Sequence, residues 1–218
     1  MSKLYFRYGA MNCGKSTSLL QVAHNYEEQG MKVILAKSVT DTKGQCAILS
    51  RLGVARKVDY LIYPDTDLMA DCRAGKFTDA ACILVDEVQF LAPAQIDQLY
   101  EIAVLHNIPV ICFGLRTDFL NHGFPGSSRL LEIAHSIQEL KNICKCGAKA
   151  TCNLRYINNS PVFTGEQVSI DNQNSVVYEA VCSSCYLKYR QQYETDPAAH
   201  FSPNEHPSNA DPAAHRIK

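Results

Sequence analysis

Eight consecutive residues near the start of the chain have the types and spacing of a loop that binds phosphate groups. They are Gly9, Ala10, Met11, Asn12, Cys13, Gly14, Lys15 and Ser16. They match the pattern G-x-x-x-x-G-K-[ST], in which glycines permit a tight turn that aims backbone N–H groups at phosphate oxygens. Lys15 would reach the β- and γ-phosphates of a nucleotide, and the Ser16 hydroxyl would bind Mg²⁺. The sequence therefore predicts a nucleotide-binding loop, with chance occurrence of the pattern as the alternative.

Two adjacent carboxylates end an apolar run later in the chain. The run covers residues 82–85 and is followed by Asp86 and Glu87. Asp86 suits the role of holding Mg²⁺ beside the phosphates, directly or through water. Glu87 is then free to act as a general base on an attacking hydroxyl group or water molecule. In isolation, such a pair is more often two solvated carboxylates at the end of a strand.

Four of the ten cysteines form two closely spaced pairs. Cys144 and Cys146 make a C-x-C pair, and Cys182 and Cys185 make a C-x-x-C pair. Tetrahedral Zn²⁺ takes four thiolates in this way, with each pair supplied by one turn. Four protein ligands would leave no open position on the metal, so we expect a structural Zn²⁺ rather than a catalytic one. Four unliganded thiols in a small domain are the alternative.

Composition and the first residues favour a cytoplasmic globular protein. The chain has 218 residues, a formal net charge of −1 and a hydrophobic share of 46%, which excludes a disordered chain. The near-neutral charge argues against a general nucleic-acid or membrane binder. Arg7 interrupts the only candidate signal segment, and no run approaches the roughly 18 apolar residues that a membrane span needs. The cytoplasm keeps thiols reduced, so paired cysteines in a cytoplasmic protein are metal ligands more often than disulfides.

The first two-thirds of the chain alternates between strand and helix patterns. Continuous apolar runs predict strands at residues 4–8, 33–36, 81–85 and 109–113. Apolar residues at helical spacing predict helices at residues 16–29 and 93–105, and Pro93 suits the start of the second helix. Buried strands separated by helices are typical of a parallel sheet covered on both faces. We therefore expect an α/β fold with a parallel sheet of the P-loop NTPase type.

The character of the sequence changes near Cys144. Residues 144–194 hold the four paired cysteines, short strand-like runs and polar turns. Residues 195–218 are rich in Pro, Ala, Asn and His, and we expect this tail to be disordered. The predicted organisation is a nucleotide-binding α/β domain at 1–143, a small zinc-binding domain at 144–194 and a tail at 195–218.

Taken together, the motifs resemble a known family. Besides the phosphate loop and the cysteine pairs, the chain has V-D-E-V-Q-F at residues 85–90 and G-L-R-T-D-F at residues 114–119. This combination is similar to that of the zinc-containing type II thymidine kinases, bacterial branch, over nearly the whole chain before the tail. The resemblance implies transfer of the γ-phosphoryl group of ATP to the 5′-hydroxyl of thymidine or deoxyuridine, with Glu87 as the catalytic base.

The resemblance also implies where the substrates bind. ATP would be held by residues 9–16 and by the segment Asp86, Glu87, Val88 and Gln89. Phe119 would contact the nucleobase, with Phe124 nearby. The family's lasso, a segment whose backbone binds the thymine edge, corresponds to Gln167, Val168, Ser169, Ile170 and Asp171. Tyr178 would close the site, and the zinc would tether both ends of the lasso. Ordinary packing is the alternative for the three aromatic residues.

Further implied properties concern assembly and regulation. Family members are homotetramers that are inhibited by thymidine triphosphate (dTTP), so we expect both here. The chain departs from the family pattern in the lasso, where Ile-Gly-Gly is replaced by Ile170-Asp171-Asn172. It also has Asp41-Thr42-Lys43 where the family has Asp-x-Arg after the second strand.

Two other functions fit parts of the sequence. One is a nucleotide hydrolase in which Glu87 activates water and the zinc module binds protein or nucleic acid. The pattern D-x-x-G at residues 41–44 suits a GTPase, but the chain lacks the Asn-Lys-x-Asp motif that reads guanine. The other is a non-catalytic sensor of ATP, which the presence of both Asp86 and Glu87 disfavours.

Overall fold

The computed structural model describes residues 1–41, 46–51, 53–167 and 176–195. By its internal contacts the chain forms two compact units. The first unit comprises Met1–Gly9, Cys13–Arg116 and Gly123–Leu140. The second comprises Ala10–Asn12, Thr117–His122 and the chain from Lys141 onward. Among the described residues, no helix is both long enough and apolar enough to cross a membrane.

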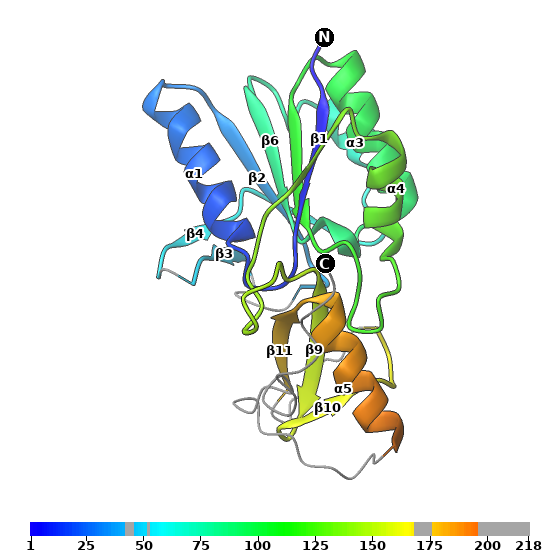
Figure 1. The fold of residues 1–218 in the computed structure, drawn as a ribbon. Helices are drawn as coiled ribbons and strands as arrows, with labels where there is room; N and C mark the ends of the chain where they lie inside the picture. The colour runs from blue at the N-terminus through cyan, green and yellow to red at the C-terminus, as the bar shows by residue number, and fades with distance from the viewer. Residues whose placement is uncertain (42–45, 52, 168–175, 196–218) are drawn as a thin grey trace. The chain divides into compact units, whose positions relative to one another are not determined.

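The first unit is built on a six-stranded sheet of order β5-β2-β6-β7-β1-β8, in which all neighbouring strands are parallel (Figure 1). The strands are β1 (Leu4–Tyr8), β2 (Val33–Ser38), β5 (Tyr60–Ile62), β6 (Cys82–Asp86), β7 (Val110–Gly114) and β8 (Ser136–Glu139). Every residue of β2, β6 and β7 is buried, as expected when both faces of a parallel sheet are covered.

Helices and one hairpin complete the first unit. They are α1 (Lys15–Glu28), the hairpin of β3 (Ala47–Leu49) and β4 (Ala55–Lys57), α2 (Leu68–Arg73), the 3₁₀ turn η1 (Val88–Phe90), α3 (Pro93–Leu105) and α4 (Pro125–Ile133). Helix α1 lies on one side of the sheet, and α3 and α4 lie on the other (Figure 1).

The alternation of side chains along β2 explains the two cores of this unit. Leu35 packs in one apolar cluster with Leu19 of α1. The neighbouring Ile34 packs in a second cluster with Ile96 of α3 and Leu130 of α4. Successive side chains of a strand point to opposite faces, so one continuous apolar run serves both cores.

The predicted α/β fold with helices on both faces is confirmed. All four predicted strands and both predicted helices are present, with small shifts at their ends. Among the elements of this unit that the sequence did not reveal, β5 has only three residues, and Ser136–Glu139 of β8 are largely exposed. Such segments carry too few apolar residues to give a periodic pattern.

The second unit contains a three-stranded antiparallel sheet of order β10-β9-β11 and one helix (Figure 1). The elements are β9 (Cys152–Ile157), β10 (Ser160–Val162), β11 (Val176–Val181) and α5 (Ser183–Thr195). Its core holds the four paired cysteines together with Leu154, Tyr156 and Tyr189. Residues 10–12 and 117–122 also belong to this unit, although nothing in their sequence indicates it. The limits at 143 and 194 stay a prediction, and the predicted tail beyond Thr195 lies outside the described residues.

Candidate active site

The phosphate loop joins β1 to α1 through backbone that only some residues adopt readily. Asn12 and Gly14 both have left-handed φ angles, 67° and 81°. A Cβ atom on Gly9 would lie 2.5 Å from the Cys13 sulfur and 2.6 Å from the carbonyl oxygen of Leu140, so only glycine fits there. Lys15 opens α1 and is buried, with its Nζ 3.3 Å from the Gly9 carbonyl oxygen. The lysine amine therefore lies over the loop that the sequence assigned to phosphate.

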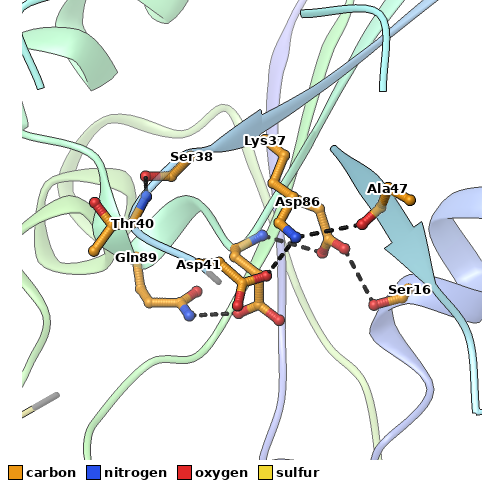
Figure 2. Close-up of polar contacts among 9 residues, drawn as sticks. Ser16, Lys37, Ser38, Thr40, Asp41, Ala47, Asp86 and Gln89 are labelled. Carbon is orange, nitrogen blue, oxygen red and sulfur yellow. Dashed lines mark hydrogen bonds and ion pairs between the residues drawn. The ribbon is translucent and has the colours of Figure 1, made fainter. Parts of the chain in front are cut away.

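Asp86 is the buried carboxylate at the end of β6. The Ser16 hydroxyl donates to its Oδ2 at 3.1 Å, and the Glu87 backbone N–H donates to its Oδ1 at 3.1 Å. Burial, followed by the neighbouring Glu87 charge, raises the pKa of Asp86 to about 7, although the two hydrogen bonds and Lys15 act in the opposite direction. The structure thus brings together the two predicted magnesium ligands, Ser16 and Asp86 (Figure 2).

Glu87 has an unusual backbone conformation for its residue type. Its φ and ψ of 48° and 41° lie in the left-handed region, where residues other than glycine are disfavoured. Its carboxylate accepts a hydrogen bond of 2.5 Å from Gln89 Nε2, and Gln89 Oε1 in turn accepts one from the Leu115 N–H at 3.0 Å. A Cβ atom on Gly114 would lie 2.6 Å from Gln89 Oε1, so this glycine makes room for the amide. Strained backbone of this kind clusters at functional sites.

A buried lysine beside Asp86 was missed by the sequence analysis. Lys37 of β2 lies opposite Asp86 in the strand register and is 1% exposed. Its Nζ forms an ion pair with Asp41 at 2.8 Å and donates to the Ala47 carbonyl at 3.3 Å (Figure 2). The available signal was a lysine directly after the apolar run of residues 33–36. Residues 41–43 are where the chain departs from the family's Asp-x-Arg pattern, and only Asp41 of the three lies within the described residues.

Phe124 is placed in the first unit, directly before α4. It is 5% exposed and packs edge-to-face on Phe90 of η1, with ring centroids 5.9 Å apart. Val88 of the same 3₁₀ turn is fully buried. A Cβ atom on Gly126 would lie 2.7 Å from the Val88 carbonyl oxygen, so α4 can approach η1 closely only at a glycine. The segment that follows Glu87 and the start of α4 are therefore packed together.

Phe119 is placed in the second unit, where two side chains hold it. Its ring lies 3.5 Å from the guanidinium carbon of Arg155, and its carbonyl accepts a hydrogen bond of 2.9 Å from the Tyr186 hydroxyl. The residue before it, Asp118, accepts hydrogen bonds of 2.8 Å from the backbone N–H groups of Leu120 and His122. The loop 117–122 is thus fixed by polar contacts as well as by burial of the ring.

Arg155 of β9 also holds the chain that leads into the predicted lasso. Its Nη1 and Nη2 atoms donate to the carbonyls of Glu166 and Thr164 at 2.9 and 2.7 Å. Gly165 between them has a φ of 106°, which suits glycine alone. Among the described residues, the buried Nε atom of Arg155 has no hydrogen-bond partner. A buried donor that is left unpaired costs stability.

The remaining predicted nucleoside contacts are only partly described. Gln167 donates from Nε2 to Asp118 Oδ2 at 3.1 Å, which links the start of the lasso to the loop that carries Phe119. Tyr178 of β11 is half-buried and lies opposite Arg155 in the register. Val168, Ser169, Ile170 and Asp171 lie outside the described residues.

The four paired cysteines lie together and can hold a metal ion. Their sulfur atoms all lie within 4.8 Å of one another, and those of Cys146 and Cys182 are 3.5 Å apart. Sulfurs around a tetrahedral zinc ion are about 3.8 Å apart when each Zn–S bond is about 2.3 Å, so the group has a suitable size. Burial, followed by hydrogen bonds to the other three thiols, raises the pKa of Cys185 above its usual range. A bound cation is what would allow these thiols to ionise together.

Comparison with known proteins decides the family. A family model described as thymidine kinase matches residues 2–186. The chain belongs to the thymidine kinase family. A thymidine kinase from Chromobacterium violaceum is 47% identical over 188 residues, which cover 85% of this chain and 98% of that protein. The thymidine kinase of Enterobacteria phage T4 is 41% identical over 185 residues, covering 84% and 94%.

One more relative and one solved structure complete the comparisons. A thymidine kinase from Lactobacillus acidophilus is 43% identical over 199 residues, covering 86% of this chain and 97% of that protein. The solved structure of the Pif1 helicase from Candida albicans aligns with 65% of this chain and 36% of its own, with a TM-score of 0.40 and 14% identity, too low for any inference. The resemblance seen in the sequence motifs is confirmed by the family match and these relatives.

Proposed function

We propose that this member of the thymidine kinase family transfers the γ-phosphoryl group of ATP to the 5′-hydroxyl of thymidine and deoxyuridine. The observation that carries the proposal is the contact of Ser16 with the buried Asp86, directly before Glu87. This contact supports the proposal, because it joins a residue of the loop that would bind phosphate to a carboxylate that would bind Mg²⁺, and the candidate base comes next in the chain. Family membership favours this function over a nucleotide hydrolase with a zinc module.

In the proposed reaction, Glu87 accepts the proton of the 5′-hydroxyl as its oxygen attacks the γ-phosphorus. The new O–P bond forms as the bond between the γ-phosphorus and the bridging oxygen of ADP breaks. ADP leaves with the bonding electrons, and the proton stays on the Glu87 carboxylate until solvent removes it. The Gln89 amide, itself held by the Leu115 N–H, would orient that carboxylate. Direct in-line transfer requires no covalent intermediate on the enzyme.

Charge on the transferring phosphates would be balanced by Lys15, by backbone N–H groups and by Mg²⁺. Lys15 would approach the β- and γ-phosphates, while the backbone N–H groups of residues 9–16 would bind their oxygens. Ser16 and Asp86 would hold Mg²⁺, which when bound with ATP neutralises the β- and γ-oxygens. Because Mg²⁺ binds the ionised carboxylate, the bound ion would lower the pKa of Asp86, which burial otherwise raises.

The nucleoside would be recognised mainly by residues of the second unit. Phe119 would contact the base from a loop held by Arg155 and Tyr186. The lasso would begin at Gln167 and continue through Val168, Ser169, Ile170 and Asp171, with Tyr178 closing the site. We also place Phe124 near the base, as the family pattern implies. A closed lasso would exclude water, which favours transfer to an alcohol over hydrolysis.

The metal that we propose for Cys144, Cys146, Cys182 and Cys185 is a structural Zn²⁺. Four thiolates fill its coordination, so its role is mechanical. Cys182 directly follows β11, and Tyr186 directly follows Cys185 in α5. Because Tyr186 holds the Phe119 carbonyl, the metal would support the nucleoside loop as well as the lasso.

Assembly, regulation and location are proposed from the family alone. We expect a homotetramer, inhibition by dTTP as the end product, and a cytoplasmic location that keeps the thiols reduced.

A labelling experiment tests the function. The full chain is incubated with γ-labelled ATP, Mg²⁺ and a panel of nucleosides, with 5′-deoxythymidine as the matched control that lacks the acceptor hydroxyl. We expect label on thymidine and deoxyuridine and none on the control. Phosphate release that does not depend on a nucleoside would instead establish the hydrolase and overturn the proposal.

A further inference from the structure

Met11, in the middle of the phosphate loop, has both of its backbone polar groups bound by side chains. The Met11 N–H donates to Asn153 Oδ1 at 2.8 Å. The Met11 carbonyl accepts from Asn142 Nδ2 at 2.9 Å. Both asparagines belong to the same compact unit as residues 10–12. Residues 10–12 of the phosphate loop therefore belong to the unit that contains the four cysteines, and side chains of that unit hold Met11.

Asn153 makes a second contact that reaches the nucleoside loop. Its Nδ2 donates to the Thr117 carbonyl at 3.1 Å, two residues before Phe119. Asn153 is 3% exposed, so its amide is largely shielded from water, although Met11 and Thr117 are half-buried. One amide group thus joins the loop proposed for ATP to the loop proposed for the base.

The two asparagines are themselves placed by the elements around the cysteines. Asn153 lies in β9 beside Cys152, opposite Ala180 of β11, which is two residues before Cys182. Asn142 precedes Cys144 by two residues, and its Oδ1 accepts the Ile143 N–H at 2.9 Å. Asparagine suits this task because its amide offers a donor and an acceptor at fixed spacing.

We propose that Asn153 is a positioning residue that couples the ATP loop to the nucleoside loop, and that Asn142 supports the ATP loop alone. The proposal rests on the function proposed above, because that function assigns the two loops to their substrates. Neither asparagine needs to touch a substrate. Each lowers the cost of ordering a loop whose N–H groups must already point at the phosphates when ATP arrives.

The two asparagines predict different kinetic signatures. Asn153→Leu removes both hydrogen bonds, and we expect KM to rise about tenfold for ATP and also for thymidine, as the loss of about one buried hydrogen bond to each loop would give. Asn142→Ala removes the bond to Met11 and the local bond from the Ile143 N–H, but no bond to the nucleoside loop, and should raise KM for ATP about threefold while leaving KM for thymidine unchanged. A role in folding alone would lower the melting temperature without separating the two KM values in this way.

The experiment combines these kinetics with direct binding. Affinity for a non-hydrolysable ATP analogue is measured by calorimetry, without nucleoside, for wild type, both variants and the control Asn159→Gly. Asn159 lies in an exposed turn of the same unit with a φ of 63°, which glycine adopts freely. We expect the same changes in affinity for the analogue as in KM for ATP, with metal content and melting temperature close to wild type in Asn142→Ala and the control.

Affinity for the ATP analogue within twofold of wild type in both variants would overturn the proposal. If Asn153→Leu does not fold, Asn142→Ala still decides whether holding Met11 affects ATP binding. A protein that binds the analogue but phosphorylates no nucleoside would overturn the proposed function while leaving the effect on ATP binding measurable. Normal ATP affinity in the variants of an active thymidine kinase would overturn the coupling alone.

Discussion

The two units of the chain hold the residues that we propose for the site by different means. In the first, Ser16, Asp86 and Glu87 lie at the ends of elements that pack in two large apolar clusters. In the second, a single cluster forms the core, and the loops are held by buried polar side chains such as Asn153 and Arg155. A sheet with an apolar core tolerates the loss of one side chain at the carboxyl end of a strand. A loop held by a few polar contacts does not, because each contact that is lost frees the backbone it bound.

This difference separates chemistry from positioning. Substitutions at the edge of the sheet should remove a step of the reaction and leave the fold intact. Substitutions in the second unit should alter substrate affinity through loops that the changed residue does not belong to. The four predictions below test this contrast.

The largest effect is expected at Glu87. Glu87→Gln keeps the shape of the side chain and removes its basicity, so kcat should fall about a thousandfold, within the range seen for loss of a general base. KM for ATP and the melting temperature should stay close to wild type. Steady-state kinetics and thermal unfolding measure this. Glu132→Gln is the matched control, since Glu132 is exposed on α4 and pairs only with Arg129 among the described contacts. Wild-type kcat in Glu87→Gln would remove Glu87 from the role of base.

The next effect concerns the cysteine cluster. Cys182→Ser should lose the metal and reduce activity roughly a hundredfold, as changes at ligands and their supports commonly do. Hydrogen exchange should show lost protection in β9, β11 and α5, with β1, β6 and β7 still protected, because the first unit has its own cores. Cys46→Ser, in an exposed position outside the cluster, is the control. Equal loss of protection in both units would contradict the contrast between them.

Arg155 tests positioning within the second unit. Arg155→Met keeps the apolar stem and removes two charge-assisted hydrogen bonds to the carbonyls of Thr164 and Glu166, as well as the stacking on Phe119. KM for thymidine should rise about tenfold, since such bonds contribute about 1.5 kcal/mol or more each and only part of the loop order is lost. KM for ATP should change little. Arg190→Met, at an exposed arginine of α5 that pairs with Glu194, is the control. Equal changes in both KM values would argue against a local role.

The same contrast explains what the sequence could reveal. The phosphate loop, Asp86 and Glu87 were recognisable because contiguous motifs and apolar runs record local structure. Asn153 and Arg155 were not, since each is one polar residue in a short strand and its partners lie at least nine positions away. Lys37 could have been noticed, because a charged residue in a fully buried strand requires a partner. Loops held by distant side chains leave no periodic pattern to detect.

The smallest effect concerns pH and returns to the first unit. The pKa of Asp86 is raised to about 7 by burial and by Glu87, so near neutral pH part of the free enzyme carries a proton on this carboxyl. Because Mg²⁺ binds only the ionised form, binding of Mg·ATP must release that proton, and affinity must weaken as pH falls through the raised pKa. Between pH 7.5 and 6.5 the ionised fraction falls about threefold for a pKa near 7, and the affinity for Mg·ATP should fall by the same factor.

Calorimetry in buffers of different ionisation enthalpy measures this proton directly. Release near pH 7 in wild type and its absence in Asp86→Asn would assign the proton to this carboxyl. Binding of thymidine alone is the internal control, since its proposed contacts lie mainly in the other unit and should not depend on Asp86. Absence of proton release on Mg·ATP binding, or an affinity that stays constant over this range, would show that Asp86 is already ionised in the free enzyme. The increase in the pKa of Asp86 that burial causes would then be offset by Lys15 and Ser16 more fully than we expect.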